Sequence, residues 1–236
     1  MPRVGLFITC LTDQFYPRVG VAVTKVLEKL GCEVEFPPGQ TCCGQPFYNN
    51  GYEKQWRALT ERMVEIFAPY EFVVTPSGSC CSMVRKNFAN SLAKKTHEFS
   101  EFLTKILKVD YARFCLPERA ALSYHYTCHL RGLGIGDNSA RTLGRMGNVE
   151  LRPLERADQC CGFGGTFAVD YPAISGAIVE DKVARIQAGG VETLVCDDAG
   201  CTMNIAGMCH RRNVDVRVKH SAELLAEAMG LDLSQW

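Results

Sequence analysis

Eight of the thirteen cysteines in this 236-residue chain fall into two sets of four that repeat one pattern. In each set a lone cysteine comes first, thirty-one residues intervene, two adjacent cysteines and a glycine follow, and a fourth cysteine comes later. The first set is Cys10, Cys42, Cys43 and Cys80, and the second set is Cys128, Cys160, Cys161 and Cys201. Because adjacent cysteine pairs are rare, their recurrence at matched spacing indicates one cysteine-bearing module used twice.

The spacing of these cysteines bears on what they bind. Four thiolates held close together repel one another unless a cation or a metal cluster takes up their charge. Structural zinc usually takes ligands in pairs with a few residues between them, whereas here ligands are adjacent or more than thirty residues apart. Adjacent thiolates can reach neighbouring irons of one cluster, and iron–sulfur clusters commonly transfer electrons. The pattern favours iron–sulfur clusters, with zinc or redox-active thiols as the alternatives.

The composition bears on the possible partners of the protein and on its cellular compartment. Lysine plus arginine equals aspartate plus glutamate, 26 against 26, which argues against a nucleic-acid-binding surface. Neither a signal peptide nor a membrane-spanning run is visible, so we expect a cytoplasmic protein with its thiols reduced. Three cysteines lack a counterpart in the other half and are expected to be small buried hydrophobic residues: Cys32, Cys115 and Cys209.

Strands and helices are expected to alternate around the cysteines. In the first half, apolar runs predict strands at 3–9, 32–36 and 71–75, and helical spacing predicts helices near 19–30, 56–67, 83–89 and 98–107. In the second half, strands are expected at 121–126, 149–153, 193–196 and, as an extra strand, 214–219. Helices are expected there near 139–146, 178–186, from 201 and over 221–229.

This alternation predicts an α/β fold of two tandem Rossmann-like modules with parallel sheets, divided into residues 1–117 and 118–236. Ligands of such folds bind beyond the carboxyl ends of the strands. Both outer cysteines of each set come just after a predicted strand, and both double-cysteine loops follow short strands. Each set of four is therefore expected to converge at one sheet edge.

The motifs around the cysteines resemble those of the cysteine-rich CCG domain family. The segments 41–47 (TCCGQPF), 76–80 (PSGSC), 125–129 (HYTCH) and 160–167 (CCGFGGTF) carry the likeness. The family includes the cysteine-rich component of heterodisulfide reductase and the iron–sulfur components of glycolate oxidase and anaerobic glycerol-3-phosphate dehydrogenase. Over nearly the whole length, the chain resembles the family's small two-repeat branch, the lactate utilization A proteins.

This resemblance implies an iron–sulfur electron-transfer subunit of a cytosolic complex that oxidises L-lactate or another 2-hydroxy acid. It implies one or two 4Fe–4S clusters held by the eight repeated cysteines, and activity only with partner subunits, namely other lactate utilization proteins. No catalytic residue of its own is expected. A heterodisulfide-reductase-like subunit, in which a cluster reduces a disulfide, and a non-catalytic zinc protein remain as alternatives.

The chain departs from the heterodisulfide reductase relative in one respect. That protein holds a non-cubane cluster through a motif that ends in CxxC, whereas Ser77 and Asp198 stand at the first cysteine position here. Four cysteines per site suit an ordinary cubane cluster or a smaller cluster, although Cys81 and Cys196 lie close enough in sequence to serve as a fifth ligand.

Further residues around the cysteines are candidates to support a cluster. His129 and Arg131 can hydrogen-bond to cluster sulfur or balance its charge, and Gly162 and Gly164 can let the backbone approach and donate N–H groups. His125 has the same options but is expected to pack in the core. Helix-capping or structural roles are expected for His97, His220, Asp197 and Asp198. If one site alone is filled, the second is favoured.

Overall fold

The computed structural model describes residues 1–234, which fold as two compact units. The first unit comprises Met1–Lys108 with Leu233 from the end of the chain, and the second unit comprises Val109–Asp232. The boundary expected between 117 and 118 lies inside strand β5 (Cys115–Tyr124). The two compact units meet earlier in the chain, between Lys108 and Val109. Within the described residues, none of the helices combines the length and apolarity that crossing a bilayer requires.

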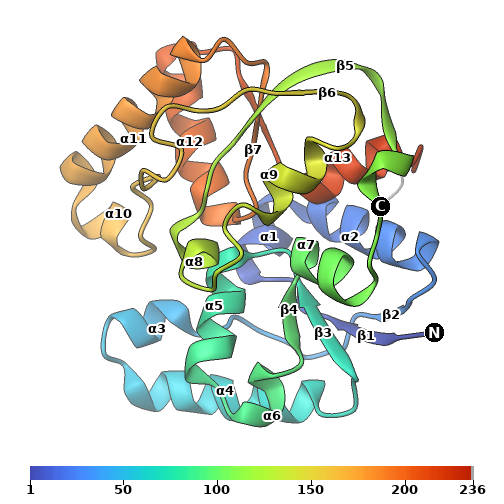
Figure 1. Cartoon of the computed structure of the whole chain (residues 1–236). Helices are drawn as coiled ribbons and strands as arrows, with labels where there is room; N and C mark the ends of the chain where they lie inside the picture. The colour runs from blue at the N-terminus through green and yellow to red at the C-terminus, as the bar shows by residue number, and fades with distance from the viewer. Residues whose placement is uncertain (235–236) are drawn as a thin grey trace. The chain divides into compact units, whose positions relative to one another are not determined.

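In residues 1–108 the first unit has a four-stranded parallel sheet with strand order β2-β1-β3-β4 (Figure 1). Its strands are β1 (Arg3–Leu6), β2 (Glu33–Glu35), β3 (Phe72–Thr75) and β4 (Thr96–Glu98). Its helices are α1 (Cys10–Phe15), α2 (Pro17–Lys29), α3 (Gln45–Asn49), α4 (Glu53–Phe67), α5 (Gly78–Asn87), α6 (Asn90–Ala93) and α7 (Phe99–Glu101), which continues into the π-helical turn η1 (Phe102–Ile106).

The second unit repeats this plan in residues 109–232, with a four-stranded parallel sheet of order β6-β5-β7-β8. Its strands are β5, β6 (Gly147–Leu151), β7 (Thr193–Val195) and β8 (Arg217–Lys219). Its helical segments are the 3₁₀ turn η2 (Tyr111–Arg113), α8 (Cys128–Arg131), α9 (Asn138–Leu143), α10 (Phe167–Asp170), α11 (Pro172–Ala188), α12 (Ala199–Arg212) and α13 (Ser221–Ala228). The predicted pair of Rossmann-like α/β modules is confirmed.

One predicted difference between the repeats is wrong. The strand at 214–219 is not an extra element, because β8 has an equivalent in β4, each at the same edge of its sheet. β4 is only three residues long, and its sequence Thr96-His97-Glu98 offers no apolar run. Its position is instead set by parallel pairing with β3, in which Val73 lies opposite Thr96.

Of the two histidines for which helix-capping or structural roles are expected, His220 is a helix cap and His97 is not. His220 caps α13, since its side chain accepts from the Ala222 N–H while Glu223 reciprocates to the His220 backbone. The equivalent cap of α7 is Glu98, which accepts from the Glu101 N–H, so His97 and His220 do not occupy equivalent positions.

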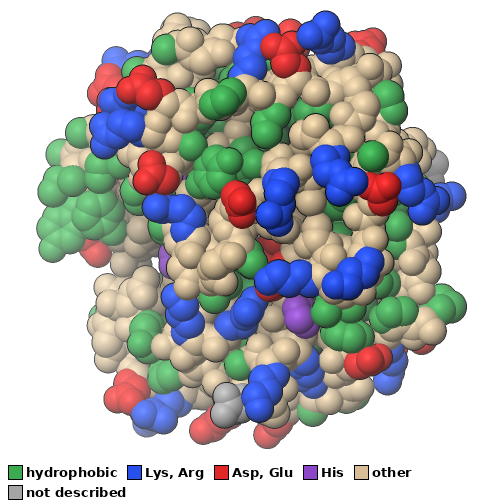
Figure 2. Space-filling model, viewed as in Figure 1, with side chains coloured by type: hydrophobic (Ala, Val, Ile, Leu, Met, Phe, Trp, Pro, Cys, Tyr) green, Lys and Arg blue, Asp and Glu red, His purple; other side chains and the backbone are tan. Residues whose placement is uncertain are grey.

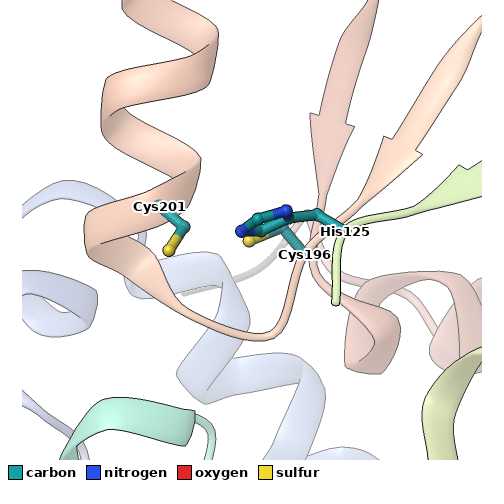
Figure 3. Close-up of side chains that lie close together, drawn as sticks. All are labelled: His125, Cys196 and Cys201. Carbon is teal, nitrogen blue, oxygen red and sulfur yellow. The ribbon is translucent and has the colours of Figure 1, made fainter. Parts of the chain in front are cut away.

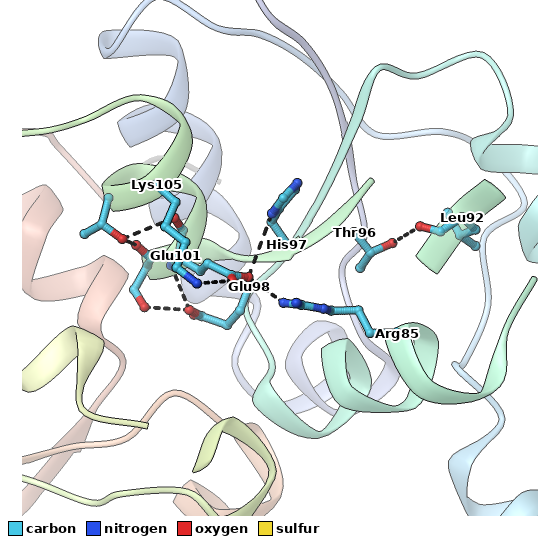
Figure 4. Close-up of polar contacts among 9 residues, drawn as sticks. Arg85, Leu92, Thr96, His97, Glu98, Glu101 and Lys105 are labelled. Carbon is cyan, nitrogen blue, oxygen red and sulfur yellow. Dashed lines mark hydrogen bonds and ion pairs between the residues drawn. The ribbon is translucent and has the colours of Figure 1, made fainter. Parts of the chain in front are cut away.

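Glu101 is the centre of a buried ion-pair network in the first unit (Figure 4). Its carboxylate receives hydrogen bonds from Arg85 at 2.7 Å and Lys105 at 2.9 Å, and His97 lies 3.8 Å away. Burial would raise the pKa of Glu101, but the hydrogen bonds from His97 and Lys105 and the charge of Arg85 lower it to about 2. The network fastens α5, which carries Cys80, to the closing helical segment.

The unmatched cysteines divide in their burial. Cys32 and Cys209 are buried, as expected for small hydrophobic residues. Cys115 is exposed, so the prediction for it is wrong; it stands at the beginning of β5, where the strand meets solvent.

Candidate metal centres

The four cysteines of the first set lie together at the carboxyl end of the first sheet. Cys10 begins α1 just after β1, and Cys80 lies in the first turn of α5 just after β3. Cys42 and Cys43 come from the loop between β2 and α3. The Sγ atoms of Cys10 and Cys42 are 3.4 Å apart, and those of Cys43 and Cys80 are 3.2 Å apart. Adjacent parallel strands thus deliver their cysteines to one place.

The thiols of the first set perturb one another strongly. The pKa of Cys42 is lowered because Cys10 and Cys43 donate hydrogen bonds to it, as does the Gly44 N–H at 3.4 Å. The pKa of Cys43 is raised by its contacts with Cys42 and Cys80 and by burial, and that of Cys10 is raised for similar reasons. One thiolate therefore suppresses ionisation of its neighbours unless a positive group joins the set.

The second set is assembled by the equivalent elements. Cys128 begins α8, Cys201 lies in the first turn of α12, and Cys160 and Cys161 are in the loop between β6 and α10. The Sγ atoms of Cys161 and Cys201 are 2.8 Å apart. Cys128 is exposed, and its pKa is raised by partial burial and by the charge of Cys161. The structure thus pairs Cys10 with Cys42 and Cys43 with Cys80 in the first set, and Cys161 with Cys201 in the second.

A glycine in left-handed conformation shapes each double-cysteine loop. Gly44 has φ of +77° and Gly162 has φ of +82°. Their N–H groups point back at the first cysteine of each pair, at 3.4 Å from Cys42 and 3.3 Å from Cys160. A Cβ on Gly162 would lie 2.7 Å from the Ser175 carbonyl oxygen, so glycine is required there for conformation and for space.

Gly164 has a different local role. Its φ is +57°, and a Cβ there would lie 2.8 Å from the Phe167 side chain. It lets the loop turn tightly into α10.

The residues at the missing cysteine positions cap the helices that carry the last cysteine of each set. Ser77 accepts from the Cys80 N–H at 3.3 Å, and Asp198 accepts from the Gly200 N–H at 3.1 Å. The capping role predicted for Asp198 is confirmed. Asp197 instead accepts from the Tyr124 hydroxyl at 2.9 Å and the Ser221 N–H at 3.2 Å, so it joins β5 to the start of α13.

Two candidates near Cys128 are placed differently from each other. His129 lies beside the cysteine, with Nδ1 3.6 Å from Cys128 Sγ. Arg131 donates to the Asp158 carbonyl at 2.8 Å and lies 3.6 Å from its carboxylate. Arg131 therefore holds α8 against the loop that precedes Cys160.

The structure adds two donors to the second set that the sequence alone did not favour as ligands. His125 and Cys196, both buried, lie with Cys201 so that one ring nitrogen and two sulfur atoms are all within 4.8 Å of one another (Figure 3). In Figure 3 the imidazole lies beside Cys196 and one ring nitrogen faces Cys201. Cys81, the other candidate for a fifth ligand, is also buried, and its pKa is raised by burial and by the charge of Glu98.

A buried lysine in the second unit has no signal in the sequence. Lys182 on α11 has 0% of its surface exposed and donates to the carbonyl oxygens of Arg156 at 3.2 Å and Ala157 at 3.0 Å. Burial lowers its pKa to about 8, while negative charge on Cys161 and neighbouring groups opposes that change. A lysine in an amphipathic helix is ordinarily a surface residue, so composition does not reveal this role.

Exposed apolar side chains follow both double-cysteine loops. In the first unit they are Phe47 and Tyr48, on α3. In the second unit they are Val169, Tyr171 and Ile174, on α10 and the start of α11, where Figure 2 shows a projecting hydrophobic patch.

The donor chemistry at both sets suits a thiophilic metal group. Each set combines exposed thiols, Cys10 in the first and Cys128 in the second, with buried ones, and each has a backbone N–H directed at sulfur. Iron–sulfur clusters are held by such thiolates, with hydrogen bonds to sulfur tuning their potential.

Comparison with known proteins gives consistent matches. The profile of the CCG cysteine-rich domain family matches the chain twice, over residues 4–85 and 122–206. The chain is 42% identical over 236 residues to lactate utilization protein A of Bacillus licheniformis, covering 94% of this chain and 98% of the relative. The protein of the same name from Geobacillus kaustophilus is 43% identical with the same coverage. Among solved structures, a putative Asp/Glu racemase from Yersinia pestis aligns over 97% of each chain, with 11% sequence identity and a TM-score of 0.41.

Proposed function

Since the chain belongs to the CCG cysteine-rich domain family, and within it to the lactate utilization A proteins, we propose that it is an iron–sulfur electron-transfer subunit in L-lactate utilization. The observation that carries this proposal is the convergence of each four-cysteine set at the carboxyl end of one parallel sheet. In that place the fold can hold one 4Fe–4S cluster per repeat, and such a cluster supplies reversible one-electron transfer.

The chain's own residues prepare the two sites. The left-handed glycines Gly44 and Gly162 aim N–H groups at sulfur. The bond from Gly44 helps to lower the pKa of Cys42, and the bond from Gly162 opposes the rise in the pKa of Cys160 that Cys161 and burial cause. Cys43 and Cys201 are buried and keep water from the inner side. Arg131 and Lys182 bind backbone carbonyls of the loop before Cys160 and thereby fix the position of that cysteine.

The proposed partners are the other subunits of a lactate-oxidising complex. Electron transfer requires a donor or acceptor protein to dock near each site. The exposed apolar residues that follow both double-cysteine loops support such docking, because surface of this kind is characteristic of protein interfaces. We further propose a cytoplasmic location, since free thiols of the chain such as Cys10 and Cys128 persist in a reducing compartment.

The decisive experiment is metal analysis of the full chain purified without oxygen. We expect about eight irons and about eight acid-labile sulfides per chain, with an electron paramagnetic resonance signal after reduction. Zinc without sulfide would overturn the proposal in favour of a zinc protein. Turnover of a disulfide substrate by the reduced chain alone would overturn the electron-relay role in favour of a disulfide reductase.

A further inference from the structure

The two repeats differ at two equivalent positions beside the cysteine sets. The backbone N–H of Phe7 donates to the Val74 carbonyl at 2.8 Å, and the N–H of His125 donates to the Val195 carbonyl at 2.9 Å. These matching bonds place His125 where the first unit has Phe7. The residue after each acceptor differs as well, because Thr75 follows Val74 whereas Cys196 follows Val195. The second repeat therefore has a nitrogen and a sulfur donor that the first replaces with a benzyl and a hydroxyl group.

The environment of His125 suits a metal ligand better than a side chain that only packs in the core. It is 1% exposed, and among the described residues its Nδ1 has no hydrogen-bond partner, which is costly for a buried polar atom. A ring nitrogen lies within 4.8 Å of the Cys196 and Cys201 sulfurs. The ring is thus next to two sulfur atoms on the buried side of the site.

We propose that His125 binds one iron of the second cluster in place of one of the four thiolates, so that this cluster has mixed cysteine and histidine ligation, whereas the first cluster is bound by cysteine alone. This inference rests on the iron–sulfur clusters of the proposed function. It makes the two sites chemically distinct. A neutral imidazole adds less negative charge than a thiolate, and histidine ligation raises the reduction potential of clusters. We therefore expect the second cluster to have the higher reduction potential of the two.

The test uses the full chain with ¹⁵N-labelled histidine, reduced and studied by pulsed electron paramagnetic resonance. Direct ligation gives a strong ¹⁵N coupling on one of the two cluster signals. His125→Phe, which installs the residue of the first repeat, is expected to abolish that coupling and to lower one reduction potential. His129→Phe is the matched control, because His129 lies beside Cys128 but on the exposed side, and it is expected to keep the coupling.

Iron and sulfide are measured on the same samples. Bound clusters without ¹⁵N coupling, or coupling that survives in His125→Phe, would overturn the histidine ligand and leave the proposed function intact. A chain without sulfide would overturn both. If His125→Phe does not fold, the assignment proceeds by replacing the other four histidines, after which the coupling must remain.

Discussion

Arg131 donates a hydrogen bond to the carbonyl oxygen of Asp158 at 2.8 Å, and this contact joins the helix that begins at Cys128 to the loop that ends at Cys160. This contact holds two segments that are distant in sequence together, and each of them carries a cysteine of the second set. We expect Arg131→Met to weaken the second unit by about 1 kcal/mol, since a charged hydrogen bond is lost at a partly exposed position.

The measurement for Arg131→Met is the rate at which an iron chelator removes the second cluster, which should rise several-fold. Arg119→Met is the control, because Arg119 lies in the same unit but pairs with the exposed Glu150. Equal rates for the two variants would contradict the role given to Arg131.

Removing a buried thiol separates ligand cysteines from packing cysteines. We expect Cys161→Ser to lose the second cluster, so that iron and sulfide fall by about half. Cys209→Ser replaces another buried cysteine of the same core, one that does not belong to the four-cysteine set, and should retain full iron content. Loss of iron in both variants would indicate unfolding rather than loss of a ligand, and circular dichroism distinguishes the two.

Lys182 places a positive charge on the buried side of the second site. We expect Lys182→Met to lower the reduction potential of the second cluster by on the order of 50 mV, because a nearby cation favours the reduced state. Lys95→Met is a close control, since Lys95 also binds carbonyl oxygens, those of Phe67, Ala68 and Tyr70, but in the first unit. An unchanged second potential in Lys182→Met, measured by redox titration, would count against the electrostatic role.

The Glu101 network predicts acid sensitivity of the first unit. The pKa of Glu101 is lowered from 4.5 to about 2, so its stabilising contribution is complete above the unfolded value and disappears as pH falls from about 4.5 toward 2. Glu101→Gln should lower the free energy of unfolding by about 3 kcal/mol at neutral pH and flatten the stability profile in that acidic window. Chemical denaturation across pH checks this, with Glu53→Gln, in an exposed pair with Arg57, as the control. A profile with unchanged slope would refute the assignment.

Much of the fold was accessible from sequence because the long elements follow simple periodicities. The strands around Val4 and Val73 are apolar runs, and the helix at Val19 to Leu27 buries one regular face. The four-cysteine sets were accessible for a different reason: repetition itself marks equivalent positions in equivalent modules.

What escaped prediction depends on neighbours distant in the chain. β4 is a strand because β3 offers it a pairing edge, although its own residues are polar. Lys182 is buried because α11 turns that side chain onto the carbonyls of Arg156 and Ala157. His125 is a candidate ligand because the fold brings its ring to Cys196 and Cys201, which lie far along the chain, and a hydropathy pattern does not reveal this.

The uneven exposure of the cysteines has a consequence for assembly of the protein. Cys10 and Cys128 reach solvent, whereas Cys43 and Cys201 do not. A scaffold protein that delivers a preformed cluster can therefore engage the exposed sulfurs first, that of Cys10 in the first repeat and those of Cys128 and Cys160 in the second, and the buried sulfurs exchange afterwards. We expect maturation to be sequential, with the exposed cysteines binding the incoming cluster first and the buried cysteines completing its ligation.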